Sequence, residues 1–132
     1  MKEFYKGLGH IAIHVRSMEE SIAFYEKIGG AVLQQAVLPS PEGDKLLCLI
    51  DLGGVTLELL RFPGEHPMTE GNIPHFAIYV ENLDGAAAAL RAAGVDTFTT
   101  PEKTVLPHTF GGLQNWFFTG PSGEQIELLE ML

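Results

Sequence analysis

Two histidines and two glutamates carry the clearest chemical signal in this sequence. They are His10, Glu58, His75 and Glu127, and each lies in a stretch whose apolar and polar residues alternate as in a strand. Glu58 lies between two leucines and Glu127 between Ile126 and Leu128, where a carboxylate is costly to desolvate unless a partner or a metal ion neutralises it. Two imidazoles and two carboxylates suit a mid-series divalent metal that keeps open positions for water or substrate. Carboxylates alone would favour Mg²⁺ or Ca²⁺.

These residues occupy duplicated positions, because the chain contains an internal repeat. The tract His10–Val15 (HIAIHV) recurs at His75–Val80 (HFAIYV), and Gly54–Leu60 matches Gly123–Leu129 around the two glutamates. Self-similarity of this kind indicates two copies of one structural unit. Diverging copies have little structural reason to keep the same polar residue at all four positions. The duplication therefore favours a shared metal site.

Each copy predicts a strand, a helix and three further strands. Helices over 18–28 and 83–93 are indicated by apolar residues at helical spacing, by N-cap residues before them and by glycine after them. The later strands are predicted at 31–38, 45–52, 54–60, 95–100, 115–119 and 123–129. The predicted fold class is α+β, with two βαβββ modules (about 7–62 and 73–132) in a single domain over 1–132.

The alternation of side chains separates two faces on each predicted sheet. On the first strand, Ile11 and Ile13 point one way, whereas His10 and the small Ala12 point the other way. The bulky face is expected to pack against the helix. The opposite face, where histidine and glutamate lie, is left with open space above the sheet.

Composition excludes several classes of protein. The chain has 132 residues, of which 45% are hydrophobic and 19% are charged, which is typical of one soluble domain. A single cysteine, Cys48, excludes an internal disulfide framework and is predicted to be a small buried residue. The net charge of −9 and the absence of a basic cluster argue against nucleic acid, and the apolar runs are too short for a membrane span. We expect a cytoplasmic protein whose partner is a small molecule or, as a homodimer, another copy of the chain.

The duplicated positions, together with the tracts Ser21–Lys27 (SIAFYEK) and Gly120–Leu128 (GPSGEQIEL), resemble the vicinal oxygen chelate superfamily, and within it glyoxalase I, a lactoylglutathione lyase. The resemblance covers nearly the whole chain. It implies that the paired modules form an eight-stranded cupped mixed sheet with the helices on the convex side. It also implies one divalent metal per site, nickel or cobalt with zinc as the alternative, bound by His10, Glu58, His75 and Glu127.

The same resemblance implies a reaction. Glyoxalase I acts on the hemithioacetal of methylglyoxal and a thiol, and it moves a proton between adjacent carbons through an enediolate. A metal at the developing oxyanion supplies electrostatic stabilisation, and a nearby carboxylate acts as general base. We expect Glu127 to be this base, with Glu58 as the second candidate.

The substrate itself is predicted to differ from glutathione adducts. His14 stands where glyoxalase I has a glutathione-binding arginine, and Arg61-Phe62 stands near the position of an asparagine. Another thiol, or another α-oxo or acyl substrate, is therefore expected. The candidate substrate contacts are His14, Leu60, Tyr79, His108, Phe110 and Leu129. The loop over 107–113, with its paired glycines, is predicted to be either a mobile lid or an ordinary loop.

Three alternative functions remain open. A methylmalonyl-CoA epimerase-like enzyme uses the same enolate chemistry, although such enzymes usually carry glutamine where this chain has Glu58. A metal-free binding protein, like the bleomycin-resistance relatives, has typically lost the metal ligands. A ring-cleaving dioxygenase needs two histidines and one glutamate around iron, usually in a longer chain of four modules. The cup is compatible with closure within one chain or across a dimer.

Overall fold

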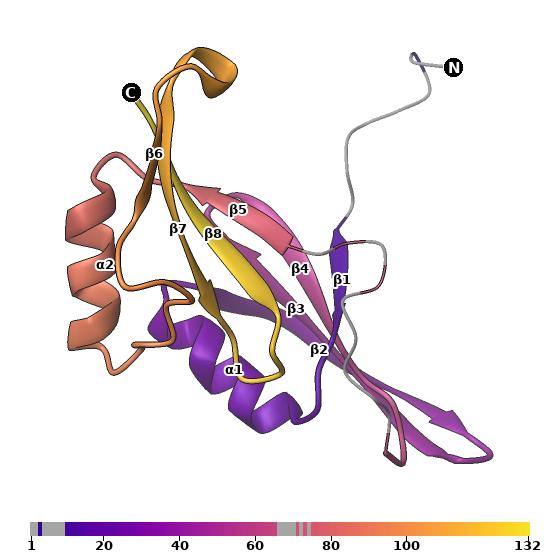
Figure 1. The fold of residues 1–132 in the computed structure, drawn as a ribbon. Helices are drawn as coiled ribbons and strands as arrows, with labels where there is room; N and C mark the ends of the chain where they lie inside the picture. The colour runs from indigo at the N-terminus through magenta and orange to yellow at the C-terminus, as the bar shows by residue number, and fades with distance from the viewer. Residues whose placement is uncertain (1–2, 4–9, 66–70, 72, 74) are drawn as a thin grey trace. The chain divides into compact units, whose positions relative to one another are not determined.

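The computed structural model describes residues 3, 10–65, 71, 73 and 75–132. The chain divides into two compact units, Met1–His66 and Pro67–Leu132. Each unit has the order strand, helix and three strands (Figure 1), so the predicted α+β fold with two βαβββ modules is confirmed. The eight strands are hydrogen-bonded as two sheets of four. In the described part of the chain, no helix is long and apolar enough to cross a membrane.

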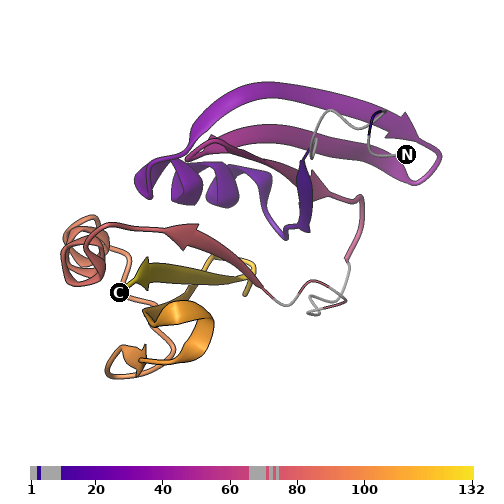
Figure 2. The same ribbon diagram turned by 90° about the horizontal axis from the view of Figure 1, so that it is seen from above.

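The first unit is a mixed sheet with one helix against it. Its elements are β1 (Ile11–His14), α1 (Met18–Lys27), β2 (Ala31–Ser40), β3 (Gly43–Leu52) and β4 (Val55–Arg61). The strand order is β1-β4-β3-β2, with β1 parallel to β4 and the other pairs antiparallel. Ser17 caps α1 by accepting a hydrogen bond from the Glu20 amide at 3.2 Å. The helix runs along one face of the sheet (Figure 2), where Tyr25, Leu57 and Leu59 are buried.

The second unit repeats this arrangement. Its elements are β5 (His75–Tyr79), α2 (Leu83–Ala92), β6 (Thr104–Leu106), the short 3₁₀ helix η2 (Thr109–Gly111), β7 (Leu113–Thr119) and β8 (Gln125–Met131). The strand order is β5-β8-β7-β6, again with the first strand parallel to the last. Asn82 caps α2 through the Gly85 amide at 3.0 Å. Leu83, Phe118 and Ile126 are fully buried in the core of this unit.

The strand predicted over 95–100 is wrong. Only Phe98 makes a bridge in this segment, to Phe118, and the bridge is isolated. The Thr97 hydroxyl donates to the Thr119 carbonyl at 2.6 Å, and such side-chain bonds compete with a regular ladder. The second strand of the unit is instead β6, which pairs antiparallel with β7.

Cys48 lies in the core of the first unit and is completely buried, as predicted. Burial raises the pKa of its thiol, and the negative charge of Glu26 raises it further. The neutral thiol therefore persists at pH values where an exposed cysteine ionises.

Candidate functional site

In the first unit, parallel pairing of β1 with β4 brings His10 and Glu58 together. Ala12 lies directly opposite Glu58, and His10 precedes it by two residues on the same face of the sheet. Because the methyl group of Ala12 leaves space beside the carboxylate, His10 Nε2 lies 3.5 Å from Glu58 Oε1. The two side chains are 44% and 22% exposed, so the pair is open to a ligand.

The second unit makes the same contact with the duplicated residues. Ala77 lies directly opposite Glu127 in the β5–β8 ladder, and His75 Nε2 lies 3.3 Å from Glu127 Oε2. The Glu127 side chain is only 11% exposed, although His75 remains 41% exposed. The second pair is therefore more deeply seated in its sheet than the first.

Two residues of β7 support this second pair. The Asn115 side-chain amide donates to Glu127 Oε1 at 2.7 Å. The ring of Phe117 packs edge-to-face against His75, with centroids 5.1 Å apart and an interplanar angle of 89°. Both members of the pair are thus restrained by neighbours on the same strand.

Sequence reasoning missed these supporting residues. In the first unit, leucines occupy the matching positions. Leu49 pairs with Glu58 as Phe117 pairs with Glu127, and Leu47 lies two residues before Leu49 as Asn115 lies two residues before Phe117. Aligning the third strands of the two copies would have revealed a polar residue where the repeat otherwise has leucine. The strand predicted over 115–119 includes Asn115, but its pattern alone does not set its register with the strand of Glu127.

The donor types fit the predicted divalent metal. Ligand atoms about 2.0–2.2 Å from an ion lie about 3 Å apart, and the nitrogen and oxygen of each pair are separated by 3.5 Å and 3.3 Å. Imidazole and carboxylate together suit a mid-series metal. Within either unit, no group of three or more His, Cys, Asp or Glu side chains that could hold an ion occurs among the described residues. Each unit therefore holds one pair of candidate donors among its described residues.

The predicted substrate contacts fall into two groups. Leu60 lies directly opposite His14, and Leu129 lies directly opposite Tyr79, so these four residues share the faces of the His–Glu pairs. His108 and Phe110 lie instead in the segment between β6 and β7, away from the strands that carry the His–Glu pairs in the sequence.

Phe110 has an unusual backbone. Its φ of 48° lies in the left-handed region, and its side chain is 87% exposed. Gly111 and Gly112, which follow it, also have positive φ values. The structure thus describes a tight, strained loop at this position and leaves its predicted role as a lid untested.

A cationic cluster lies farther along the face of Glu58. The rings of His14 and Phe62 meet edge-to-face with centroids 4.9 Å apart, and Lys45 Nζ lies 4.7 Å from the Phe62 centroid. Phe62 follows Glu58 by four residues, which corresponds to roughly 13 Å along a strand. Sequence reasoning named His14 but missed Lys45, because the contact depends on the register of β3 with β4.

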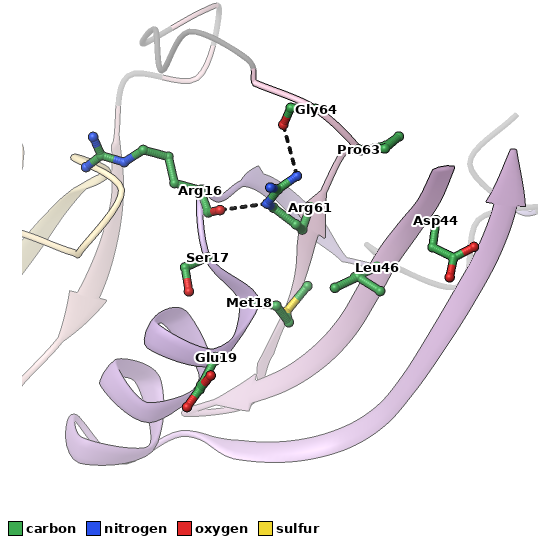
Figure 3. Close-up of a pocket in the computed structure, with 9 residues that line it drawn as sticks. All are labelled: Arg16, Ser17, Met18, Glu19, Asp44, Leu46, Arg61, Pro63 and Gly64. Carbon is green, nitrogen blue, oxygen red and sulfur yellow. Dashed lines mark hydrogen bonds between the residues drawn. The ribbon is translucent and has the colours of Figure 1, made fainter. Parts of the chain in front are cut away.

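A cavity of about 420 Å³ lies on the other face of the first sheet (Figure 3). Arg61 lines it, and its guanidinium donates from Nε to the Arg16 carbonyl at 2.6 Å and from Nη1 to the Gly64 carbonyl at 3.3 Å. Arg61 is an odd number of residues from Glu58 on β4, so the cavity is not part of the His–Glu face. Its lining consists of Arg16, Ser17, Met18, Glu19, Asp44, Leu46, Arg61, Pro63 and Gly64.

Comparison with known proteins defines the class. Residues 7–128 match the Glyoxalase/Bleomycin resistance protein/Dioxygenase superfamily, and the chain belongs to this family. The resemblance to the vicinal oxygen chelate superfamily is therefore confirmed at the level of the superfamily.

Particular relatives include two epimerases and a glyoxalase family protein. The chain is 34% identical over 104 residues to human mitochondrial methylmalonyl-CoA epimerase, covering 73% of this chain and spanning only 58% of that relative. It is 28% identical over 143 residues to 2-epi-5-epi-valiolone epimerase of Actinomyces sp, covering 92% and 78% of the two chains. The structure of a glyoxalase family protein from Enterococcus faecalis matches with a TM-score of 0.74 and 26% identity, over 96% of this chain and 99% of that one.

Proposed function

We propose that this chain is a divalent-metal-dependent lyase or isomerase of the glyoxalase I kind. It removes a proton from a carbon beside a carbonyl group and returns it to the neighbouring carbon of a thiohemiacetal or related α-oxo substrate. The observation that carries the proposal is the repeated contact of a histidine nitrogen with a glutamate oxygen, at 3.5 Å in one unit and 3.3 Å in the other.

In this proposal four side chains bind the metal, and one of them also transfers the proton. His10 and Glu58 of the first unit, together with His75 and Glu127 of the second, would be the residues that hold the metal. When bound, the metal polarises the substrate oxygens as a Lewis acid. Glu127 is the proposed base, because its position is restrained by neighbours and a base must stay within reach of the proton that it takes.

A second candidate is an epimerase acting on an acyl thioester or a sugar-like ketone. It is favoured by the two epimerases among the relatives. In this proposal the first step is again removal of a proton beside a carbonyl. An epimerase returns the proton to the opposite face of the same carbon. Enzymes like methylmalonyl-CoA epimerase usually carry glutamine at the position of Glu58, and the glutamate here supports the glyoxalase I hypothesis instead.

The cationic cluster of His14, Lys45 and Phe62 is proposed to bind the tail of the substrate. The Lys45 ammonium rests over the Phe62 ring and makes no ion pair among the described residues. A carboxylate or phosphate on the substrate would supply the missing partner. The cluster lies on the face of Glu58 at a distance that suits an extended thiol or acyl carrier.

A proton-exchange experiment tests the proposal, because both candidate reactions begin by removing a proton beside a carbonyl group. Protein reconstituted with Ni²⁺, Co²⁺ or Zn²⁺ is incubated in D₂O with methylglyoxal adducts of several thiols and, in parallel, with acyl-CoA esters. We expect deuterium to enter the carbon beside the carbonyl in the wild type and not in the Glu127→Gln variant, which has the same shape. Only weak turnover of the glutathione adduct is expected, because His14 replaces the arginine.

The same experiment can overturn the proposal. A protein that retains no transition metal after Ni²⁺ reconstitution would contradict the enzyme hypothesis, as would a metal-loaded protein that exchanges no substrate proton. Turnover of the glutathione adduct at the rate of a proficient glyoxalase would contradict the role given to His14. Exchange confined to acyl-CoA esters would select the epimerase.

A further inference from the structure

Asn115 is a polar residue on a strand whose neighbours are largely aromatic. It follows Gln114 on β7 and is half-buried, and its side chain extends to the carboxylate of Glu127 on β8. The length of the bond, 2.7 Å, lies in the range of charge-assisted hydrogen bonds, which are stronger than those between neutral groups. The contact is therefore a substantial restraint on the glutamate.

This hydrogen bond determines which oxygen of Glu127 is presented to the site. Oε1 accepts from Asn115, and Oε2 lies 3.3 Å from Nε2 of His75. With one oxygen held, rotation of the carboxylate would break the bond and leave an amide unpaired, which is unfavourable in a buried position. Oε2 is thus kept in a single place beside the imidazole.

Glu58 has no comparable restraint. Its only polar contact among the described residues is with His10. Leu47, which occupies the position that corresponds to Asn115 in strand register, cannot donate a hydrogen bond. The two carboxylates of the repeat are therefore unequal, although their sequence contexts are nearly the same.

We propose that Asn115 is a positioning residue for Glu127, holding Oε1 so that Oε2 alone faces the metal and the proton that is transferred. The inference rests on the proposed function of Glu127. Residues that orient a metal ligand in this way typically change metal affinity by 10–100-fold when they are removed. In this proposal Asn115 acts through its hydrogen bond to Glu127.

The chain offers a matched control on the same pair of strands. Gln114 Nε2 donates to Glu130 Oε2 at 2.8 Å, one residue along β7 and on its opposite face. Asn115→Leu installs the residue of the first unit, and Gln114→Leu removes an equivalent amide–carboxylate bond away from the site. The dissociation constant for Ni²⁺, measured by calorimetry, is expected to rise about 10–100-fold in Asn115→Leu and to change little in Gln114→Leu. Equal changes in the two variants, or none in either, would overturn the proposal.

A second measurement uses the metal-free protein and needs no activity. The side-chain amide of Asn115 is followed by nitrogen-15 NMR in the wild type and in Glu127→Ala. Loss of the carboxylate is expected to shift the amide signals and to speed their exchange with solvent, whereas unchanged signals would show that Asn115 does not hold Glu127. If the wild type binds no Ni²⁺, the proposed function fails, while this comparison still decides whether the positioning contact exists.

Discussion

The contacts of both His–Glu pairs depend on residues that take no part in them. Ala12 and Ala77 lie directly opposite the glutamates, and their small side chains let each histidine approach from two residues away. The nitrogen and oxygen atoms can then serve as donors for a single ion. The chemistry of the site is thus set by single residues and by the space that their neighbours leave.

Replacing either glutamate by glutamine tests the donor role at this scale. Glu58→Gln and Glu127→Gln keep the side-chain volume but remove the negative charge. We expect each variant to bind Ni²⁺ at least about tenfold more weakly, in line with the loss of a charged ligand. Calorimetry with elemental analysis measures this, and Glu102→Gln, at an exposed position, is the control. Wild-type affinity in both site variants would refute the ligand assignment.

Cys48 provides a prediction about reactivity. Because burial and Glu26 raise its pKa, the fraction of thiolate at pH 8 is lower than for an exposed cysteine. Iodoacetamide is expected to label the folded protein far more slowly than the urea-unfolded protein, as followed by mass spectrometry. Since Cys48 is the only cysteine, the labelling is unambiguous. Similar rates in the two states would contradict the burial of this residue.

At the scale of elements, the register between strands brings together residues that are far apart in the sequence. The pairing of Leu46 with Arg61 places Lys45 beside Phe62, and the parallel pairing of β1 with β4 brings His14 to the same ring. A cation from β3, an imidazole from β1 and the aromatic ring that follows β4 therefore meet on one face. No local pattern in the sequence predicts this cluster.

The cluster is expected to govern binding rather than the chemical step. Lys45→Met keeps much of the apolar stem and removes the charge, so KM for a substrate with an anionic tail should rise by about tenfold while kcat is unchanged. Lys27→Met is a matched control on α1, where the lysine is exposed. Steady-state kinetics with the substrate found in the exchange experiment measures both constants. An unchanged KM would show that the tail binds elsewhere.

At the scale of the whole molecule, each unit carries half of the proposed ligand set. Each contains one imidazole in contact with one carboxylate, and no group of three or more such donors occurs among the described residues of either unit. A metal that uses all four donors requires the folded form of both units. Metal binding and stability should therefore be linked.

This linkage predicts a thermal shift. A ligand that binds only the folded state at a concentration one hundred times its dissociation constant stabilises that state by about 2.7 kcal/mol. Ni²⁺ is expected to raise the unfolding midpoint of the wild type in calorimetry, and a chelator should reverse the rise. The shift should be much smaller in both Glu58→Gln, which alters the first unit, and Glu127→Gln, which alters the second. A shift that survives either substitution would indicate binding within one unit alone.

The sequence by itself determined the order of the elements and the faces on which the four chemical residues lie. Helix caps and the alternation of strands depend on neighbours along the chain, so the βαβββ repeat and the shared face of histidine and glutamate could be predicted. Only the tertiary structure decided that Asn115 holds Glu127, that Lys45 lies over Phe62 and that 95–100 is not a strand. These features depend on register between residues distant in sequence and on competition from side-chain hydrogen bonds, which no local pattern records.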